Sequence, residues 1–242
     1  MMSVKDLTKK FGGFTAVDHI SLQIRRGEIF GFLGANGAGK TTAMRMLCGL
    51  SVPTSGTGTV AGYDILRQAE EIKRHIGYMS QKFSLYEGLT VWENLNLFAT
   101  IYGMSARSIR EKADAAFKAM GMENMWNVLV REIPLGWKQK LAFMAATLHS
   151  PDIVFLDEPT GGVDPSTRRK FWEMIYRASS EGMTVFVTTH YLDEAEYCHR
   201  VSIMVDGSVK ALDSPSGLKR LYHADTMDEV FRVVAKDAKR SD

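Results

Sequence analysis

Short apolar runs alternate with helical patterns along most of the chain. Residues 29–33 (IFGFL), 153–157 (IVFLD) and 184–189 (TVFVTT) are almost wholly apolar, as strands buried on both faces of a sheet should be. Residues 165–182, between the last two runs, have helical spacing. This alternation predicts an α/β fold around a mainly parallel sheet.

Flanking segments extend this pattern. Residues 19–35 contain two strand-like runs joined by a turn at Arg26–Gly27, and we expect an antiparallel β subdomain at the N-terminal end. Residues 50–80 are expected to hold turns and short strands. Residues 200–212 predict a closing hairpin around Asp206–Gly207.

A helical block interrupts the alternation from about Leu89 to Asn127. We therefore predict one domain over residues 1–222, with a helical subdomain inserted at about residues 82–140. A short C-terminal helical tail is expected over residues 223–242. The stretch from Ser214 onward predicts two short helices, the last of them amphipathic.

Composition and charge narrow the classes of function. The 242 residues are 45% hydrophobic and 24% charged, with a net charge of +2, which is typical of a globular protein and does not favour a nucleic-acid partner. Cys48 and Cys198 are far apart, which favours free thiols in a reducing compartment. There is no secretory signal pattern and no apolar run of roughly 20 residues. We expect a cytosolic chain whose membrane role would require a partner.

A glycine-rich loop carries the strongest chemical signal. GANGAGKTT fits G-x-x-x-x-G-K-T, follows an apolar run and opens a helical pattern. In such a loop the backbone N–H groups surround the phosphates, Lys40 adds a positive charge, and the Thr41 hydroxyl suits Mg²⁺. The predicted nucleotide-binding residues here are Gly34, Ala35, Asn36, Gly37, Ala38, Gly39, Lys40, Thr41 and Thr42.

Polar side chains follow the other apolar runs. Asp157 can hold the Mg²⁺ shell, and Glu158 is suited to polarise an attacking water. His190 could reach the γ-phosphate from the end of a parallel strand beside the loop, although a structural histidine is the alternative. Gln81 follows a short strand and carries no signal of its own.

The order of these features resembles the ATP-binding-cassette (ABC) ATPases from about Val4 to about Leu221. It runs from Phe11 through the glycine-rich loop, Gln81, a helical insertion, LGWKQKLA, IVFLDE and GGVD to His190. The resemblance implies a P-loop NTPase core that binds ATP and Mg²⁺ and pairs head to tail with an identical or related nucleotide-binding domain. It also implies a membrane permease as partner, and therefore a peripheral position at the cytoplasmic face of the cell membrane.

The resemblance also assigns roles to single residues. Phe11 would stack on adenine, although Phe14 is a nearby rival and Phe11 could instead be a core aromatic. Asp164 in GGVD would lie in a loop that crosses to the other subunit. The implied metal-binding residues are Thr41, Gln81 and Asp157, and the implied catalytic residues are Lys40, Gln81, Glu158 and His190.

One motif departs from the family pattern. The usual Leu-Ser-Gly-Gly, which caps the γ-phosphate held by the other subunit, is here Ile133, Pro134, Leu135 and Gly136. Pro134 lacks the serine hydroxyl and an N–H, but the helix N-terminus keeps its dipole. A lost hydrogen bond to a charged group costs about 1.5–3 kcal/mol. The variant resembles one in drug-type exporters, which favours a tuned or asymmetric cap; decay of the motif is the alternative.

Together these features predict the ATP-hydrolysing subunit of a transporter that resembles multidrug exporters. The alternative is a nucleotide-gated binding module with little turnover. A family member that acts on ribosomes or DNA fits less well, since these residues show no long coiled-coil insertion. The stretch after Gln81 resembles the family's contact zone for a permease. Its apolar side chains could instead pack within the helical lobe: Phe83, Leu85, Tyr86 and Leu89.

Overall fold

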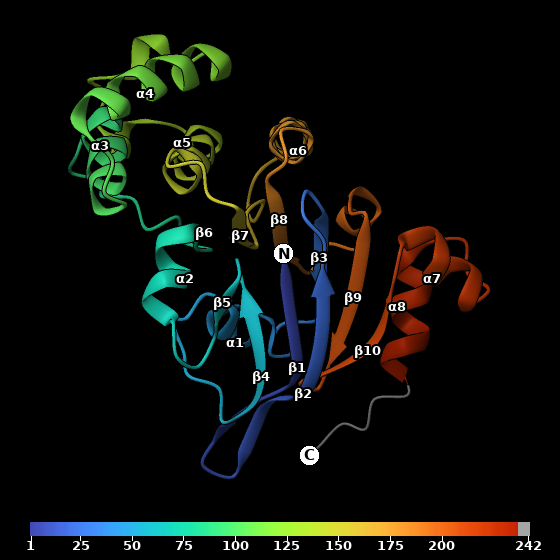
Figure 1. The fold of residues 1–242 in the computed structure, drawn as a ribbon. Coiled ribbons are helices and arrows are strands. Elements are labelled where there is room, and N and C mark those ends of the chain that lie inside the picture. Colours follow the sequence, from blue (N-terminus) through green and yellow to red (C-terminus); the bar gives the residue numbers. More distant parts are fainter. Residues whose placement is uncertain (237–242) are drawn as a thin grey trace.

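The apolar runs form a six-stranded sheet in this computed structural model, which describes residues 1–236 (Figure 1). The strand order is β10-β9-β3-β8-β7-β6, and every neighbouring pair except β9 and β10 is parallel. The strands are β3 (Ile29–Leu33), β6 (Ile76–Met79), β7 (Ile153–Asp157), β8 (Thr184–Thr189), β9 (Arg200–Val205) and β10 (Ser208–Asp213). The predicted α/β fold and the closing hairpin are confirmed.

A second sheet is antiparallel and has the order β2-β1-β4-β5. Its strands are β1 (Met2–Phe11), β2 (Phe14–Ile24), β4 (Ser55–Val60) and β5 (Tyr63–Asp64). The predicted turn at Arg26–Gly27 is present, with Gly27 at φ 71°. It joins strands of two different sheets, because β2 lies in the antiparallel sheet and β3 in the parallel one.

Helix α1 (Lys40–Leu47) is buried between the two sheets. Alternate strand residues point to opposite faces, so Phe30, Phe155 and Phe186 share the face that packs toward α1. Their rings meet at centroid distances of 5.7 Å (Phe30 to Phe186) and 5.3 Å (Phe155 to Phe186). This packing fixes the helix that begins at Lys40 against the centre of the sheet.

The opposite face of the parallel sheet is covered by helices from the second half of the chain. They are α5 (Leu135–Thr147), α6 (Pro165–Ser180), α7 (Pro215–Leu221) and α8 (Met227–Lys236). Phe171, Trp172 and Ile175 of α6 are fully or almost fully buried there. The two predicted tail helices are therefore present, and the rest of the tail, residues 237–242, lies outside the described residues.

The helical lobe projects from one side of the molecule, at the upper left of Figure 1. It contains α3 (Val91–Ile101), α4 (Ala106–Met120) and the 3₁₀ turns η1 (Glu123–Met125) and η2 (Val130–Glu132). A capping box between Thr90 and Glu93 starts α3. The lobe has its own core, to which α5 contributes Leu141 and Met144, while Ala142 and Phe143 pack against the parallel sheet. Residue 140 thus lies inside a helix shared by lobe and core.

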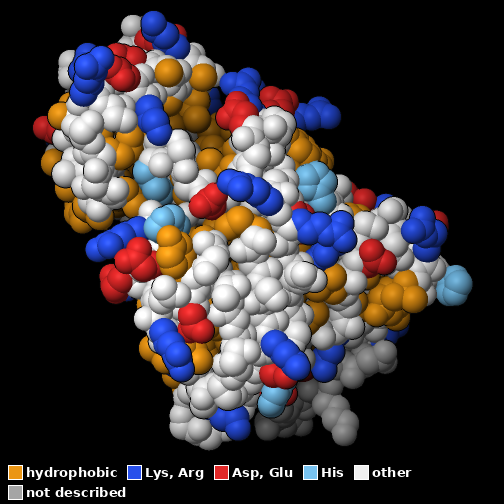
Figure 2. Space-filling view, in the orientation of Figure 1, with side chains coloured by type: hydrophobic (Ala, Val, Ile, Leu, Met, Phe, Trp, Pro, Cys, Tyr) orange, Lys and Arg blue, Asp and Glu red, His pale blue; other side chains and the backbone are white. Residues whose placement is uncertain are grey.

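One helix was not expected: α2 (Ala69–His75) lies in the stretch predicted to hold only turns and strands. It is short, its N-cap Gln68 makes no side-chain cap, and Ile72 alone is buried, so its sequence signal is weak. No helix within residues 1–236 is both long and apolar enough to cross a bilayer. Figure 2 shows acidic and basic side chains interspersed on the visible face.

Candidate nucleotide-binding site

The glycine-rich loop connects the end of β3 to the first residue of α1. Gly39 is the N-cap of α1 at φ 101°, a left-handed conformation that favours glycine, and a Cβ there would collide with the carbonyl oxygen of Ala16. A cavity of about 400 Å³ opens beside the loop. It is lined by Phe14, Ala16, Asn36, Gly37, Gly39, Lys40, Thr41, Thr42, Gln81 and Glu158.

Lys40 is buried at the base of this cavity, with 4% of its side chain exposed. Its Nζ donates hydrogen bonds to the carbonyl oxygens of Gly34 (2.7 Å) and Ala35 (3.1 Å). The same nitrogen lies 3.4 Å from Oε1 of Glu158. The ammonium group is therefore held between the loop and the carboxylate, where a bound phosphate would compete for its hydrogens.

Glu158 is the point at which the predicted catalytic residues meet. Its Oε2 accepts hydrogen bonds from Nε2 of Gln81 and from Nδ1 of His190, both at 3.0 Å. Its backbone is left-handed, with φ 47°, which is uncommon for a residue with a side chain. The structure thus brings Lys40, Gln81 and His190 around one carboxylate, which is only 8% exposed.

Asp157, the last residue of β7, is buried directly beneath the loop. Its Oδ1 accepts a hydrogen bond from the Thr188 hydroxyl (2.7 Å) and a longer one from the Thr41 hydroxyl (3.3 Å). The hydrogen bond from Thr41 shows that Asp157 and Thr41 lie together, as the metal-site prediction requires.

The charge of Asp157 also reaches Tyr78. Burial, and secondarily this charge, raise the pKa of Tyr78 to about 12.

Thr188 is a site residue that the sequence analysis missed. Its hydroxyl oxygen accepts the N–H of Glu158 at 3.0 Å while its hydrogen bonds Asp157. The signal that could have identified it is a pair of threonines immediately before His190, at the end of an otherwise apolar run.

The two candidate aromatics occupy the turn between β1 and β2. Phe11 and Phe14 are register partners and are 56% and 65% exposed. Phe14 lines the nucleotide cavity, whereas Phe11 does not and instead lies 5.1 Å below Nζ of Lys9. The geometry therefore favours Phe14, the rival, over the residue assigned by the resemblance.

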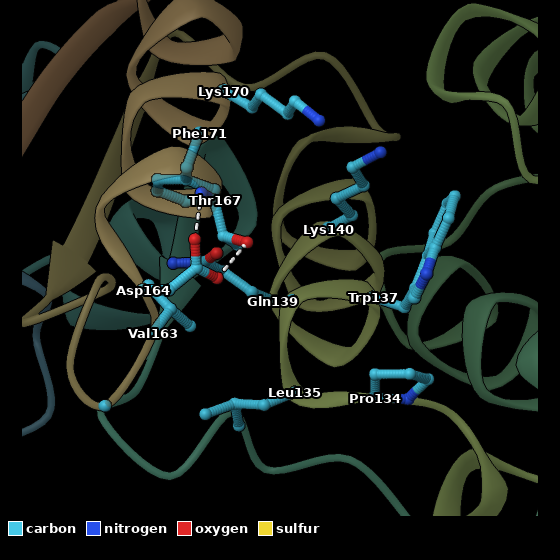
Figure 3. Close-up of a pocket in the computed structure, with 12 residues that line it drawn as sticks. Pro134, Leu135, Trp137, Gln139, Lys140, Val163, Asp164, Thr167, Lys170 and Phe171 are labelled. Carbon is cyan, nitrogen blue, oxygen red and sulfur yellow. Dashed lines mark hydrogen bonds between the residues drawn. The ribbon is translucent and has the colours of Figure 1, made fainter.

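The variant motif lines a different cavity, of about 380 Å³, between α5 and α6 (Figure 3). Pro134, Leu135 and Gly136 line it, and Figure 3 shows Pro134 and Leu135 at the start of α5 and Asp164 hydrogen-bonded to Thr167 of α6. None of these residues lines the cavity beside Lys40. The structure therefore separates the motif from the nucleotide cavity of its own chain, as expected for a cap that acts on a second subunit.

Pro134 is the N-cap of α5, at φ −59° and ψ 156°, and makes no side-chain cap. Its carbonyl oxygen accepts the N–H groups of Trp137 and Lys138 at 2.9 and 3.1 Å. The N–H groups of Leu135 and Gly136 precede these and make no hydrogen bond to any of residues 1–236. Two donors and the helix dipole thus remain at this end for an anion.

Gly136 has a packing role of its own. A Cβ at this position would lie 2.8 Å from Cγ2 of Thr167 on α6. The Thr167 hydroxyl donates to Oδ2 of Asp164 (2.6 Å), and Asp164 Oδ1 caps α6 by accepting the N–H groups of Ser166 and Thr167. These bonds, with the Thr167 hydroxyl first, hold the pKa of Asp164 well below its usual range. Close approach at Gly136 therefore joins the motif to the GGVD loop.

A glycine-rich loop between β3 and α1, with carboxylates at the end of β7, one strand further along the same sheet beyond β8, defines a P-loop nucleotide-binding protein. The family model for ABC transporters matches residues 17–161. The chain belongs to the ABC transporter family.

Curated relatives agree with this assignment. The chain is 47% identical to the probable multidrug ABC transporter ATP-binding protein YbhF of Escherichia coli over 98% of its own length, and spans 42% of that protein. It is 37% identical to the Nod factor export ATP-binding protein I of Paraburkholderia xenovorans, over 87% of this chain and 69% of the relative. The chain thus spans less than half of the first of these relatives.

Solved structures share the fold. An ATP-binding subunit of an ABC transporter superposes with a TM-score of 0.87 at 28% identity, covering 97% of this chain and 99% of the other. The ATP-binding cassette MJ0796, solved as a dimer in a post-hydrolysis state with ADP and Pi, has a TM-score of 0.80 at 27% identity. That match covers 88% of this chain and 98% of the cassette.

Proposed function

We propose that this chain is the ATP-binding and ATP-hydrolysing unit of an ABC exporter, with ATP-driven pairing of two such units powering a permease. The observation that carries the proposal is the convergence of Lys40, Gln81 and His190 on Glu158 beside the glycine-rich loop. The names of its relatives support export, and in particular drug-type export.

Glu158 is suited to take a proton from the attacking water. A carboxylate offers about four acceptor positions, and Oε2 uses two of them for Gln81 and His190. A water could therefore still donate to this group. Because Glu158 accepts from Nδ1, Nε2 is the His190 ring nitrogen left to face the γ-phosphate, and it donates to that anion when both ring nitrogens carry a proton.

ATP would lie along the loop, with its phosphates at the N–H groups near Lys40 and its adenine against the aromatic turn. The Thr41 hydroxyl and the Asp157 carboxylate are 3.3 Å apart and offer hard oxygen ligands, which fit Mg²⁺. Gln81 lines the same cavity and is the third candidate ligand. Mg²⁺ bound there would neutralise charge on the phosphates.

A second nucleotide-binding domain, identical or related, would complete each site. The separation of the Pro134–Gly136 cavity from the loop supports a head-to-tail pair, in which each motif caps the partner's ATP. The dimeric MJ0796 structures are consistent with such a pair. Asp164, beside the motif, would lie in the crossing loop.

A permease would dock between core and lobe, which would hold the chain at the cytoplasmic face of the membrane. A groove of about 740 Å³ lies there and is lined mainly by apolar side chains. Ile101 and Leu50 on its rim are 68% and 51% exposed. Phe83 lines the groove, while Leu85 packs against the cores of the parallel sheet and of the helical lobe. The stretch after Gln81 therefore contributes both to the groove and to the internal packing.

Steady-state ATP hydrolysis tests the proposal. The purified chain should hydrolyse ATP in the presence of Mg²⁺, and Glu158→Gln should bind ATP but lose turnover. The second candidate function, a nucleotide-gated module with little turnover, is favoured by Pro134, which offers no side-chain cap at the motif. It would be supported if the unaltered chain, paired with its permease, were no faster than Glu158→Gln.

A further inference from the structure

A buried carboxylate that the proposed reaction does not use lies close behind the site. Glu194 begins the 3₁₀ turn η3 (Glu194–Tyr197) and is 0% exposed. Its Oε1 accepts the hydroxyl hydrogen of Thr160, and its Oε2 accepts that of Thr189 at 2.6 Å. Both oxygens are therefore engaged by neutral donors from two different segments.

Arg168 of α6 supplies the compensating charge. Its Nε lies 3.6 Å from Oε1 of Glu194, an ion-pair distance rather than a hydrogen bond. Its guanidinium group also pairs with Asp193 (3.3 Å) and lies 4.0 Å from the ring of Tyr191. The arginine is thus held on three sides and is only 17% exposed.

The placement of these partners along the chain is what gives Glu194 a role. Thr160 is two residues after Glu158, and Thr189 directly precedes His190. Arg168 is one helical turn beyond Asp164, to whose carbonyl oxygen its N–H is bonded. The crossing loop comprises residues 161–164. Thr160 before it and Arg168 after it both contact the Glu194 carboxylate, which also accepts a hydrogen bond from Thr189 at the end of β8.

A buried charge needs a reason, because desolvation makes it costly unless it is fully paired. Hydrogen bonds and ion pairs fix distances and directions more strictly than apolar contacts do. The neighbouring peptide is fixed from the other side as well, since the Gln139 amide of α5 donates to the Pro159 carbonyl oxygen. Glu158 keeps its left-handed backbone between these two anchors.

We propose that Glu194 is a positioning residue that sets the distance between Glu158 and His190 and, through Thr160 and Arg168, ties the crossing loop to both. This inference rests on the proposed ATPase function. It links the crossing loop to the hydrolytic groups through the Glu194 side chain, so a partner subunit that displaces residues 161–164 would also displace Glu158 and His190.

Glu194→Gln tests this, because it keeps the size of the side chain but removes one acceptor and the charge. We expect kcat for ATP to fall roughly ten- to a hundred-fold, the effect of a small misplacement of reacting groups. KM should change little, since Lys40 and the loop are untouched. Glu196→Gln is the matched control: Glu196 lies in the same turn but pairs at the surface with Lys219 (2.8 Å), and its variant should hydrolyse ATP normally.

The hydroxyl contacts provide an independent variant. Thr189→Val removes the bond to Glu194 and should lower kcat in the same way, whereas Thr189→Ser keeps the hydroxyl and should restore most of it. If Thr189 only supported the fold, Thr189→Val and Thr189→Ser would instead lower kcat equally. Unchanged kcat in Glu194→Gln, or an equal loss in Glu196→Gln, overturns the proposal.

Hydrogen exchange gives a readout that does not depend on turnover. Amide protection of residues 158–164 should fall in Glu194→Gln and stay unchanged in Glu196→Gln, with both variants folded by circular dichroism. If the unaltered chain does not hydrolyse ATP but this exchange difference appears, the proposed function fails and the positioning role stands. If the unaltered chain hydrolyses ATP and amide exchange of residues 158–164 is the same in Glu194→Gln and Glu196→Gln, the positioning role fails and the proposed function stands.

Discussion

At the scale of single residues, the site depends on a few polar side chains at the ends of buried strands. Asp157, Glu158 and His190 each follow a strand residue that is fully buried or nearly so, which leaves their side chains few alternative positions. Glu158 is held by three neighbours in an uncommon backbone conformation. Local strain of this kind persists where the surrounding structure determines it.

The aromatic turn offers a test at this scale. Base–aromatic stacking contributes about 1–3 kcal/mol per base, so the double change Phe11→Ala with Phe14→Ala should raise KM for ATP about five-fold or more. The two single variants then assign the contact, and we expect Phe14→Ala to carry most of the effect because Phe14 lines the cavity. Wild-type KM in the double variant would show that neither ring touches adenine.

His149 makes stability depend on pH. Burial lowers its pKa from the ordinary 6.5 to about 4, against a partial opposing effect of its hydrogen bond to the Ile76 carbonyl. Below pH 6.5 the unfolded chain takes up a proton that the folded chain refuses, so the free energy of unfolding falls as the pH drops toward 4.

After a discount for partial exposure, the loss between pH 6.5 and about pH 5 should be about 1 kcal/mol. Denaturant unfolding at the two pH values measures it. The non-titrating variant His149→Gln should be less stable at neutral pH, because the stacking of His149 on Tyr102 is lost. It should also lose stability less steeply with acid. A parallel pH dependence in the variant and the wild type would exclude His149 as the group responsible.

At the scale of secondary-structure elements, α5 is the connection between motif, lobe and core. It begins at the variant motif, sends Leu141 into the lobe core and packs Ala146 close against β6. Strand β6 in turn leads to Gln81. A displacement of α5 relative to β6 would therefore move both the motif at the start of α5 and Gln81 in the nucleotide cavity.

Gly77 makes the close approach of α5 and β6 possible. A Cβ there would collide with the carbonyl oxygen of Ala146, a backbone atom that cannot move without shifting the helix. Gly77→Ala should therefore destabilise the fold by about 3 kcal/mol, as overpacking of a tight site does. Gly88→Ala, in open space at a position without positive φ, is the control and should change stability little. Chemical denaturation compares the two, and equal stabilities would refute the tight contact.

At the scale of the whole molecule, the proposed head-to-tail pairing assigns two incomplete halves of a nucleotide site to each chain. One cavity is lined by Lys40 and Glu158, and the other by the motif, whose Leu135 and Gly136 N–H groups make no hydrogen bond within residues 1–236. Head-to-tail pairing would bring one half of each type together. The chain departs from the family pattern at the motif, where Pro134 and Leu135 replace the serine and glycine usual in the family.

Restoring the usual residues tests the weak-cap account. In a pair of identical chains assembled with its permease, Pro134→Ser with Leu135→Gly should raise ATP turnover by roughly ten-fold, because a hydrogen bond to a charged group is regained. The same double change in a Glu158→Gln background is the control and should stay inactive. An unchanged rate would favour decay of a motif that contributes nothing.

Much of the fold and of the candidate site could be predicted from local pattern. Continuous apolar runs are typical of strands buried on both faces, and β3, β7 and β8 follow them closely. The glycine-rich loop could be identified because its glycines and lysine lie within nine consecutive residues. Helix α2 could not, since a seven-residue helix with one buried side chain leaves little trace in a sequence.

The sequence by itself determined the glycine-rich loop with Lys40, and the carboxylates Asp157 and Glu158, as candidate site residues, because their signal depends on side-chain type and on short spacing. Only the tertiary structure decided which of them meet. Gln81, Glu158 and His190 come from three separate segments and reach one another only because β6, β7 and β8 are neighbours in one parallel sheet. The same is true of Glu194 in η3, which meets Thr160 from the loop between β7 and α6 and Arg168 from α6, and no pattern along the chain predicts these contacts.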